Sequence, residues 1–242
     1  MPTACADCPL RCQPMFQPMN AGEVAFMQAF KSSEVEVAAG QVLLWEGQSS
    51  PWLYTVLRGQ GLRSKSLPDG ERQVVNFVFP GDFLGLQSGV MGEMKHSVEA
   101  TTDMTLCRFE RNELWRVFRD QPARAFDLTY LAATEEHFLG EALLTLGQRD
   151  ATSRLAWALL RLWRRAVATG MQGPRGVPLP WRQRDLADAL GLSLVHTNKT
   201  LARLRILGAA HWSGGYLAVP DPARLAELAQ EEDGASTPRP LF

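Results

Sequence analysis

Residues 186–204 read LADALGLSLVHTNKTLARL, and this stretch determines how the C-terminal part of the chain folds. Ala187 and Gly191 stand four residues apart, which puts a small side chain before a residue that tolerates a positive φ. The turn between two crossing helices requires that combination. Ser193 follows at a position where its side chain caps a second helix. The stretch therefore predicts a helix-turn-helix.

The second helix of this motif, predicted over residues 194–207, has a buried and an outward face. The predicted buried side chains are Thr197, Thr200, Leu201 and Leu204. Amide, ammonium and small apolar side chains remain outward near its start, and these groups match base edges in the major groove, whereas nearby arginines suit phosphates. The predicted DNA contacts are Val195, His196, Asn198, Lys199, Arg203, Arg182 and Arg184. A helical hairpin with no role in DNA binding is the alternative.

Charge is unevenly distributed along the 242 residues, although the net charge is only -1. Residues 151–220 contain ten Lys and Arg against two Asp and no Glu. A basic block of this size between acidic segments is typical of a nucleic-acid-binding module. An ordinary solvated basic face would show the same composition.

The segments on either side of the motif extend this C-terminal domain. Residues 149–169 have the period of an amphipathic helix, and residues 170–180 are rich in Gly and Pro, so a loop is expected there. Residues 211–219 surround Gly214-Gly215 and predict a β-hairpin. Together they indicate a winged helix-turn-helix.

Residues 35–109 show a different pattern of short apolar or alternating runs separated by glycines. The predicted strands cover residues 41–45, 52–57, 73–79, 98–100 and 105–109. Several short strands with Gly-rich turns favour a small all-β barrel or roll. A short helix is predicted before it over residues 20–30, with Asn20 as its cap and Glu23 at the third helical position.

A long helix is predicted from residue 122 to residue 146. Its side chains at alternating steps of three and four form a coiled-coil-like seam, which suggests contact with a second subunit. The predicted dimer seam comprises Leu128, Leu131, Glu135, Phe138, Ala142 and Thr145. A second stripe, Ala125, Ala132, Leu139 and Leu146, is expected to pack against the roll. One broad buried face within a monomer is the alternative.

The four cysteines are Cys5, Cys8, Cys12 and Cys107. Three within eight residues and one far away do not resemble a secreted disulfide framework, and in a reducing cytosol such a group more often binds metal. No apolar run approaches the length that spans a bilayer, and the start of the chain lacks the features of a signal peptide. A cytoplasmic protein with no membrane partner is expected.

Three segments together resemble the CRP/FNR family of bacterial regulators over nearly the whole chain: Gly81-Asp82-Phe83-Leu84-Gly85, residues 146–155 and residues 186–204. The resemblance implies an α+β chain with a double-stranded β-roll of the cyclic-nucleotide-binding type, a long dimerisation helix and a winged helix-turn-helix. It implies a transcription regulator, not an enzyme, that binds double-stranded DNA as a homodimer and works with RNA polymerase. The expected divisions are a cysteine-rich segment, the roll, the dimerisation helix, the DNA-binding domain and a tail, over residues 1–20, 21–120, 121–147, 148–222 and 223–242.

The signal must be inferred from this chain's own residues. The resemblance to the oxygen-sensing FNR branch implies a [4Fe-4S] cluster with Cys5, Cys8, Cys12 and Cys107 as ligands. The FNR pattern has a wider gap between its second and third cysteines, so a zinc site or a thiol redox switch stays open. Cyclic-nucleotide sensors of the family have a Glu and an Arg-Ser pair where this chain has Leu86 and His96-Ser97, which argues against cyclic AMP as ligand.

Two further alternatives concern the roll. Haem or a small ligand could be sensed there, with His96, Met91 and Met94 as candidate axial ligands. A cupin-like metalloenzyme would need several His ligands inside the barrel, and His96 is the only one in the roll. In the DNA-reading helix, the FNR branch has Glu, Ser and Arg where this chain has Val195, Asn198 and Lys199, so a different DNA half-site is expected.

Overall fold

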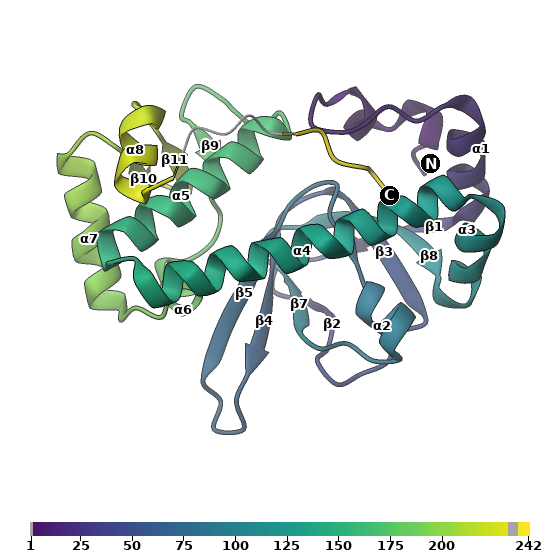
Figure 1. The fold of residues 1–242 in the computed structure, drawn as a ribbon, viewed down its shortest axis with the longest axis horizontal. Coiled ribbons are helices and arrows are strands. Elements are labelled where there is room, and N and C mark those ends of the chain that lie inside the picture. Colours follow the sequence, from purple (N-terminus) through teal and green to yellow (C-terminus); the bar gives the residue numbers. More distant parts are fainter. Residues whose placement is uncertain (1, 232–236) are drawn as a thin grey trace. The chain divides into compact units, whose positions relative to one another are not determined.

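The computed structural model describes residues 2–231 and 237–242, which form two compact units (Figure 1). The first, here called the roll unit, comprises Met1–Lys65, Asn76–Glu135 and Thr237–Phe242. The second, the C-terminal unit, comprises Ser66–Val75 and Glu136–Ser236. The last six residues of the chain therefore belong with the β-roll, although they follow the DNA-binding domain in the sequence.

Two four-stranded antiparallel sheets form the roll. The first has the strand order β1 (Lys31–Val37), β8 (Met104–Glu110), β3 (Trp52–Arg58) and β6 (Phe83–Leu84); the second has β2 (Val42–Leu44), β7 (Ser97–Ala100), β4 (Gly61–Ser66) and β5 (Arg72–Val78). Successive side chains of a strand point to opposite faces, so Leu106 lies in the core inside the roll, whereas Cys107 and Phe109 lie on the outer face of the first sheet. The sequence did not predict β1 and β4, because their polar residues hide the alternation.

Short helices surround the roll. The helix α1 (Ala21–Phe30) has the predicted capping box, in which Asn20 accepts from the Glu23 amide. Before it, two short 3-10 turns, η1 (Cys5–Asp7) and η2 (Pro9–Cys12), carry Cys5 and Cys12 with Cys8 between them, and the closely spaced prolines of this segment prevent a longer helix. Three elements not predicted from the sequence are α2 (Leu86–Met91), η3 (Arg111–Glu113) and α3 (Leu114–Asp120).

The long helix α4 (Pro122–Gln148) is confirmed, but the side chains of the predicted dimer seam face the chain's own interior. The sheet-side cluster of the roll unit contains Leu128 and Leu131, and Phe138 stacks on Trp157 of α5 with 6.3 Å between ring centroids. Thr145 is fully buried, and Ala142 is half-buried. These bulky residues pack against the roll or against α5, because each of the two has apolar side chains that must be buried.

Glu135, the polar member of that seam, also has partners within the chain. Its carboxylate lies 3.1 Å from a guanidinium nitrogen of Arg63 and accepts from the Asn76 amide at 3.2 Å. The second stripe is only partly as predicted, since Ala125 is buried but Ala132 and Leu139 are exposed. The helix is therefore confirmed, and the chain's own residues cover most of the predicted seam, while the position of a dimer interface on α4 stays a prediction.

The C-terminal unit contains α5 (Ala151–Ala168), α6 (Gln183–Leu190), α7 (Leu194–Ile206), α8 (Pro222–Ala229) and a three-stranded sheet in the order β10 (His211–Ser213), β11 (Tyr216–Ala218), β9 (Val177–Pro178). The hairpin is confirmed, and β9 occupies part of the expected loop. The expected tail, residues 223–242, contains most of α8, and its residues 232–236 lie outside the described residues. Among the described residues, no helix is long and apolar enough to cross a membrane.

Candidate DNA interface and cysteine site

The helix-turn-helix is built by the local signals expected from the sequence. Gly191 ends α6 with a φ of +61°, and the Leu192 amide donates to the carbonyl of Ala187 at 3.1 Å. Ala187 is buried where the two helices meet. Ser193 caps α7 by accepting from the amide of His196 at 3.2 Å. The orientation of α7 in this unit therefore follows from three short-range interactions.

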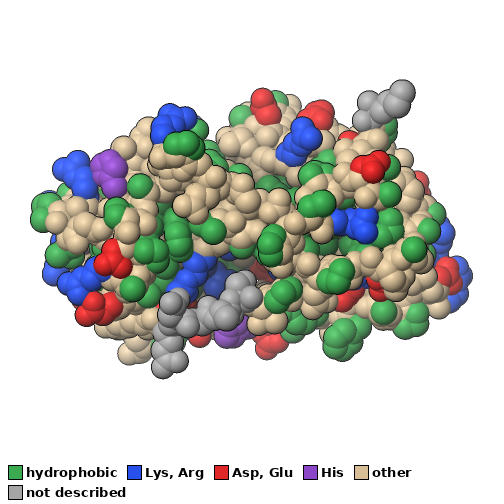
Figure 2. Space-filling view, turned by 90° about the horizontal axis from the view of Figure 1, so that it is seen from above, with side chains coloured by type: hydrophobic (Ala, Val, Ile, Leu, Met, Phe, Trp, Pro, Cys, Tyr) green, Lys and Arg blue, Asp and Glu red, His purple; other side chains and the backbone are tan. Residues whose placement is uncertain are grey.

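The predicted buried and outward faces of α7 are observed. Thr197, Thr200 and Leu204 are buried, and Leu201 is half-buried. All the predicted DNA contacts are exposed: Val195, His196, Asn198, Lys199, Arg203, Arg182 and Arg184. Figure 2 shows Lys and Arg side chains at its left-hand end, over the C-terminal unit. A polar, basic and partly apolar surface is thus available at the start of α7.

The first helix of the motif has a partner that the sequence did not indicate. Arg72, in the segment Ser66–Val75 that belongs to the C-terminal unit, donates to Asp185 at 2.5 Å and to Asp188 at 2.8 Å. Asp185 also accepts from the amide of Arg182 at 2.8 Å, at the start of α6. These contacts hold the two acidic side chains of the basic block away from the surface of α7.

Cys107 occupies the middle of the first roll sheet. It lies opposite Glu34 of β1 and opposite Thr55 of β3 in the strand register. Residues directly opposite each other in a sheet point to the same face. The outer face of this sheet therefore presents Glu34, Cys107 and Thr55 in one row, here called the cysteine face.

The N-terminal segment lies on this cysteine face. Cys5 and Cys107 both pack against one apolar cluster of the roll unit, and Cys8 and Cys107 both pack against a second one. Cys12, at the end of η2, is exposed. Within the described residues, no group of three or more His, Cys, Asp or Glu side chains is arranged to hold a metal ion. Cys107 thus shares apolar surroundings with Cys5 on one side and with Cys8 on the other, whereas Cys12 lies outside both clusters.

Burial and charge act in opposite directions on these thiols. Burial raises the pKa of Cys107 to about 11 and also raises the pKa of Cys5, while the ammonium of Lys31 favours both thiolates. Lys31 donates to Glu34 at 2.6 Å and to the carbonyl of Thr3 at 2.7 Å, and the Thr3 amide donates to Glu34 at 2.8 Å. Lys31 and Glu34 thus fasten the start of the chain to β1. Four thiols are the donor set that a [4Fe-4S] cluster takes, but the described residues do not bring even three of them into a group that could hold a metal ion.

Comparison with known proteins identifies the family. Residues 34–121 match the cyclic nucleotide-binding domain family, and residues 153–228 match the Crp-like helix-turn-helix domain family. The chain is 31% identical to the nitrogen fixation regulation protein FixK of Bradyrhizobium diazoefficiens over 225 residues, which cover 93% of each chain. This chain belongs to the CRP/FNR family of DNA-binding transcription regulators.

Other relatives of this CRP/FNR regulator agree with that assignment. It is 28% identical over 238 residues to the transcriptional activator protein FnrL of Cereibacter sphaeroides, covering 97% of this chain and 95% of FnrL. The solved structure of FixK2 from Bradyrhizobium japonicum superposes with a TM-score of 0.74 at 27% identity, covering 84% of this chain and 98% of that chain. The expected fold of roll, long helix and Crp-like helix-turn-helix is confirmed.

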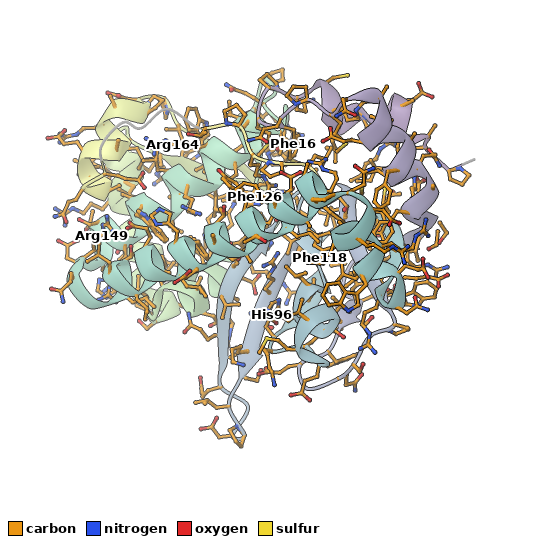
Figure 3. All side chains as sticks on the ribbon, turned by 45° about the vertical axis from the view of Figure 1, so that its right-hand side comes forward. Phe16, His96, Phe118, Phe126, Arg149 and Arg164 are labelled. Atoms are coloured by element: carbon orange, nitrogen blue, oxygen red, sulfur yellow. The ribbon has the colours of Figure 1, made fainter. Side chains whose placement is uncertain are left out.

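The roll of the CRP/FNR regulator has cations near His96 that the sequence analysis did not place there. Burial first, and then Arg63 and Lys65, lower the pKa of His96 to about 3 (Figure 3). Each cation has its own carboxylate, since Arg63 pairs with Glu135 and Lys65 with Glu46. Of the other candidate axial ligands, Met94 is buried and Met91 is exposed.

His96 provides a prediction about stability. The unfolded chain protonates His96 below pH 6.5, whereas the folded chain keeps it neutral down to about pH 3. The free energy of unfolding should therefore fall as the pH drops through this window, by at most about 1.4 kcal/mol per pH unit. Denaturant unfolding of wild type and His96→Gln between pH 7 and pH 4.5 measures how much of the pH dependence comes from His96. A difference between the two proteins that stays constant with pH would contradict it.

Proposed function

We propose that this CRP/FNR regulator senses oxygen or redox state through a [4Fe-4S] cluster held by Cys5, Cys8, Cys12 and Cys107, and that it binds an inverted-repeat DNA site as a homodimer. One observation carries the proposal. Cys107 lies on the cysteine face directly beneath the N-terminal segment, and it shares its apolar surroundings with Cys5 and Cys8, about one hundred residues away in sequence.

The chain's own residues would position the ligands and exclude water from them. Lys31 and Glu34 fasten the start of the chain to β1, and Arg11 donates to the carbonyls of Cys5 and Ala6 at 3.2 and 2.9 Å. When bound, such a cluster supplies a redox centre whose potential depends on hydrogen bonds and burial. Because burial raises the pKa of Cys5 and Cys107, loading must displace protons and becomes easier as the pH rises.

A zinc site or a thiol switch is the second candidate, and the exposure of Cys12 favours the thiol switch. An exposed thiol reacts with oxidants or exchanges with other thiols more readily than a buried one.

Anaerobic purification followed by iron, sulfide and zinc determination separates the candidates. Four irons and four sulfides per chain, with broad visible absorption lost in air, would support the cluster. Zinc without sulfide would overturn it, and a sharp Soret band would indicate haem.

A different face of α4 is available for the proposed homodimer. The exposed large apolar residues of this helix are Phe126, Leu139, Leu143 and Leu144 (Figure 3 labels Phe126). Gly140 and Gly147 are also exposed, and a Cβ added to either would meet nothing within 4 Å. A helix-interior glycine costs about 1 kcal/mol relative to alanine, so glycines that the chain's own packing does not require suggest a close approach by a second helix. We therefore place the seam on this face instead of the one predicted from the sequence.

The proposed division of labour follows the family. The roll would sense the signal, α4 would hold the two subunits together, and the two copies of α7 would enter successive major grooves. The regulator would act in the cytoplasm and contact RNA polymerase from its DNA site. Its relatives are transcription regulators and suggest no catalytic role.

Asn198 is expected to read a base. Asn198→Ala should weaken binding to the preferred site by roughly tenfold to a hundredfold, because a bidentate pair with adenine contributes about 1–3 kcal/mol. Lys199→Ala should instead weaken binding to all sequences and flatten the salt dependence. Fluorescence anisotropy on a site selected from random DNA measures both effects. Asn112→Ala, a substitution of an exposed asparagine of η3, is the matched control.

Equal losses on specific and random DNA for Asn198→Ala would exclude base reading by Asn198. Recovery of the standard FNR half-site from random DNA would exclude an altered site preference.

A further inference from the structure

The last six described residues, Thr237–Phe242, lie on the roll unit next to the cysteine-bearing segment. Phe16 and Arg239 form a parallel bridge, in which the amide of Gln17 donates to the carbonyl of Arg239 at 2.9 Å and the amide of Arg239 donates to the carbonyl of Met15 at 2.8 Å. Figure 1 shows the C-terminus beside α4, and Figure 3 labels Phe16 on the N-terminal segment. The two ends of the chain are thus paired through their backbones.

The side chains of this C-terminal segment are as buried as those of the core. Leu241 is 4% exposed and packs with Leu10, Phe16 and Leu57, a cluster that Cys8 and Cys107 also contact. Phe242 is 3% exposed, and its ring centroid lies 4.8 Å from that of Phe83. Residues this buried contribute to stability in proportion to the apolar area that they remove from water. The segment is therefore an integral part of the roll unit.

Polar contacts fix the register of the segment. Arg239 pairs with Asp82 at 2.9 Å, and Asp82 is almost fully buried in the Gly81-Asp82-Phe83 motif. The backbone carbonyl of Leu241 accepts from Arg124 at 3.2 Å, and that of Phe242 accepts from the Thr55 hydroxyl. Thr55 stands next to Cys107 in the row that forms the cysteine face. Through Thr55 of β3, the segment thus lies beside Cys107. Glu34 of β1 lies on the other side of Cys107.

The N-terminal segment packs closely against the roll at Gly81. Its φ is +83°, and an added Cβ would come within 2.1 Å of the Phe16 ring. The ring of Phe16 therefore occupies the space that any other residue at position 81 would fill, and Arg239 stacks over the same ring with 5.4 Å to its centroid. Phe16 is held between the roll and the C-terminal segment.

We propose that Thr237–Phe242 act as a strap that closes over the cysteine-bearing segment and holds it on the cysteine face. The strap pairs with Met15 and Gln17 through its backbone, so any event that displaces residues 5–16 also weakens the attachment of the strap, and the reverse holds by linkage. The inference goes beyond the proposed function and does not depend on an iron–sulfur cluster. It assigns the C-terminal residues of the chain a role in holding the cysteine-bearing segment on the roll.

Maleimide labelling of the full chain, reduced and free of metal, tests the strap. In the wild type, Cys12 should react quickly and Cys107 slowly, because only Cys12 is exposed. Phe242→Ala should speed the labelling of Cys107 about a hundredfold, since loss of a buried Phe shifts the local opening equilibrium strongly. Arg239→Ala should give an increase of about tenfold through loss of the Asp82 ion pair. Neither substitution should change the rate at Cys12.

Matched controls distinguish a strap from general destabilisation. Phe118→Ala removes a partly exposed Phe of α3 in the same unit and should leave Cys107 unchanged. Hydrogen exchange in Phe242→Ala should rise at residues 10–17 but not at Val56 and Leu106 in the roll core. Unchanged labelling of Cys107 in both strap variants would overturn the proposal. Equal acceleration of exchange in the core strands would also overturn it, because the segment would then be only one part of a single cooperative fold.

Discussion

Under the proposed four-cysteine ligand set, replacing Cys107 with alanine is expected to remove at least nine-tenths of the iron and sulfide found after anaerobic purification. Cys107 is the only cysteine supplied by the roll, and it lies between the apolar clusters that hold Cys5 and Cys8. With one thiolate lost, the remaining three cysteines all lie on the N-terminal segment, which no longer has a ligand on the sheet to bind against. Elemental analysis and the visible spectrum measure the loss.

The control for Cys107→Ala lies on the same strand. Thr105→Ala truncates a side chain two residues away on the same face of β8, where the hydroxyl donates to Glu36. This variant should keep wild-type iron content, so that loss in Cys107→Ala reports a missing ligand instead of a damaged strand. Full iron and sulfide in Cys107→Ala would contradict the four-cysteine ligand set. The DNA affinity of the two variants, measured anaerobically, would then show whether Cys107 contributes to switching.

Introducing an aspartate at Leu143 should convert the proposed dimer to a monomer. Leu143 is 71% exposed on α4, and in a two-fold interface one substitution acts on both subunits. If the change costs about 2 kcal/mol in each subunit, the dimer dissociation constant rises about a thousandfold. Sedimentation velocity over a concentration series measures this, and binding to an inverted repeat should fall with it because each monomer reaches only one half-site.

The exposed Leu67, in the segment Ser66–Val75, is the control for this experiment. Leu67→Asp places the same charge on a leucine that is 63% exposed but does not lie on α4, and it should leave the dimer intact. Gly140→Ala gives an independent test, since the added methyl group meets nothing within the chain. It should stabilise the isolated helix and weaken the dimer. A dimer unaffected by both Leu143→Asp and Gly140→Ala would move the interface away from this face.

The helix-turn-helix was predictable because its signals act over short distances. Ala187, Gly191 and Ser193 interact with residues within five positions, so their roles depend little on the rest of the chain. The capping box at Asn20 is local in the same way. The strand β1 was missed because its alternating residues are mostly Ser and Glu, whose roles become apparent only once Lys31 and Thr3 are seen beside Glu34.

The sequence by itself predicted the long helix over residues 122–146 and the polar and basic groups at the start of the helix over residues 194–207, because helix period and capping depend on near neighbours. Only the folded chain could assign the faces of α4, since apolar residues occur on more than one side of it and the packing of Leu128 and Phe138 selects among them. The position of Phe242 depends on Thr55, 187 residues earlier in the chain. Contacts at such separation leave no periodic trace in a sequence, and they arise from the burial of aromatic and aliphatic surface in three dimensions.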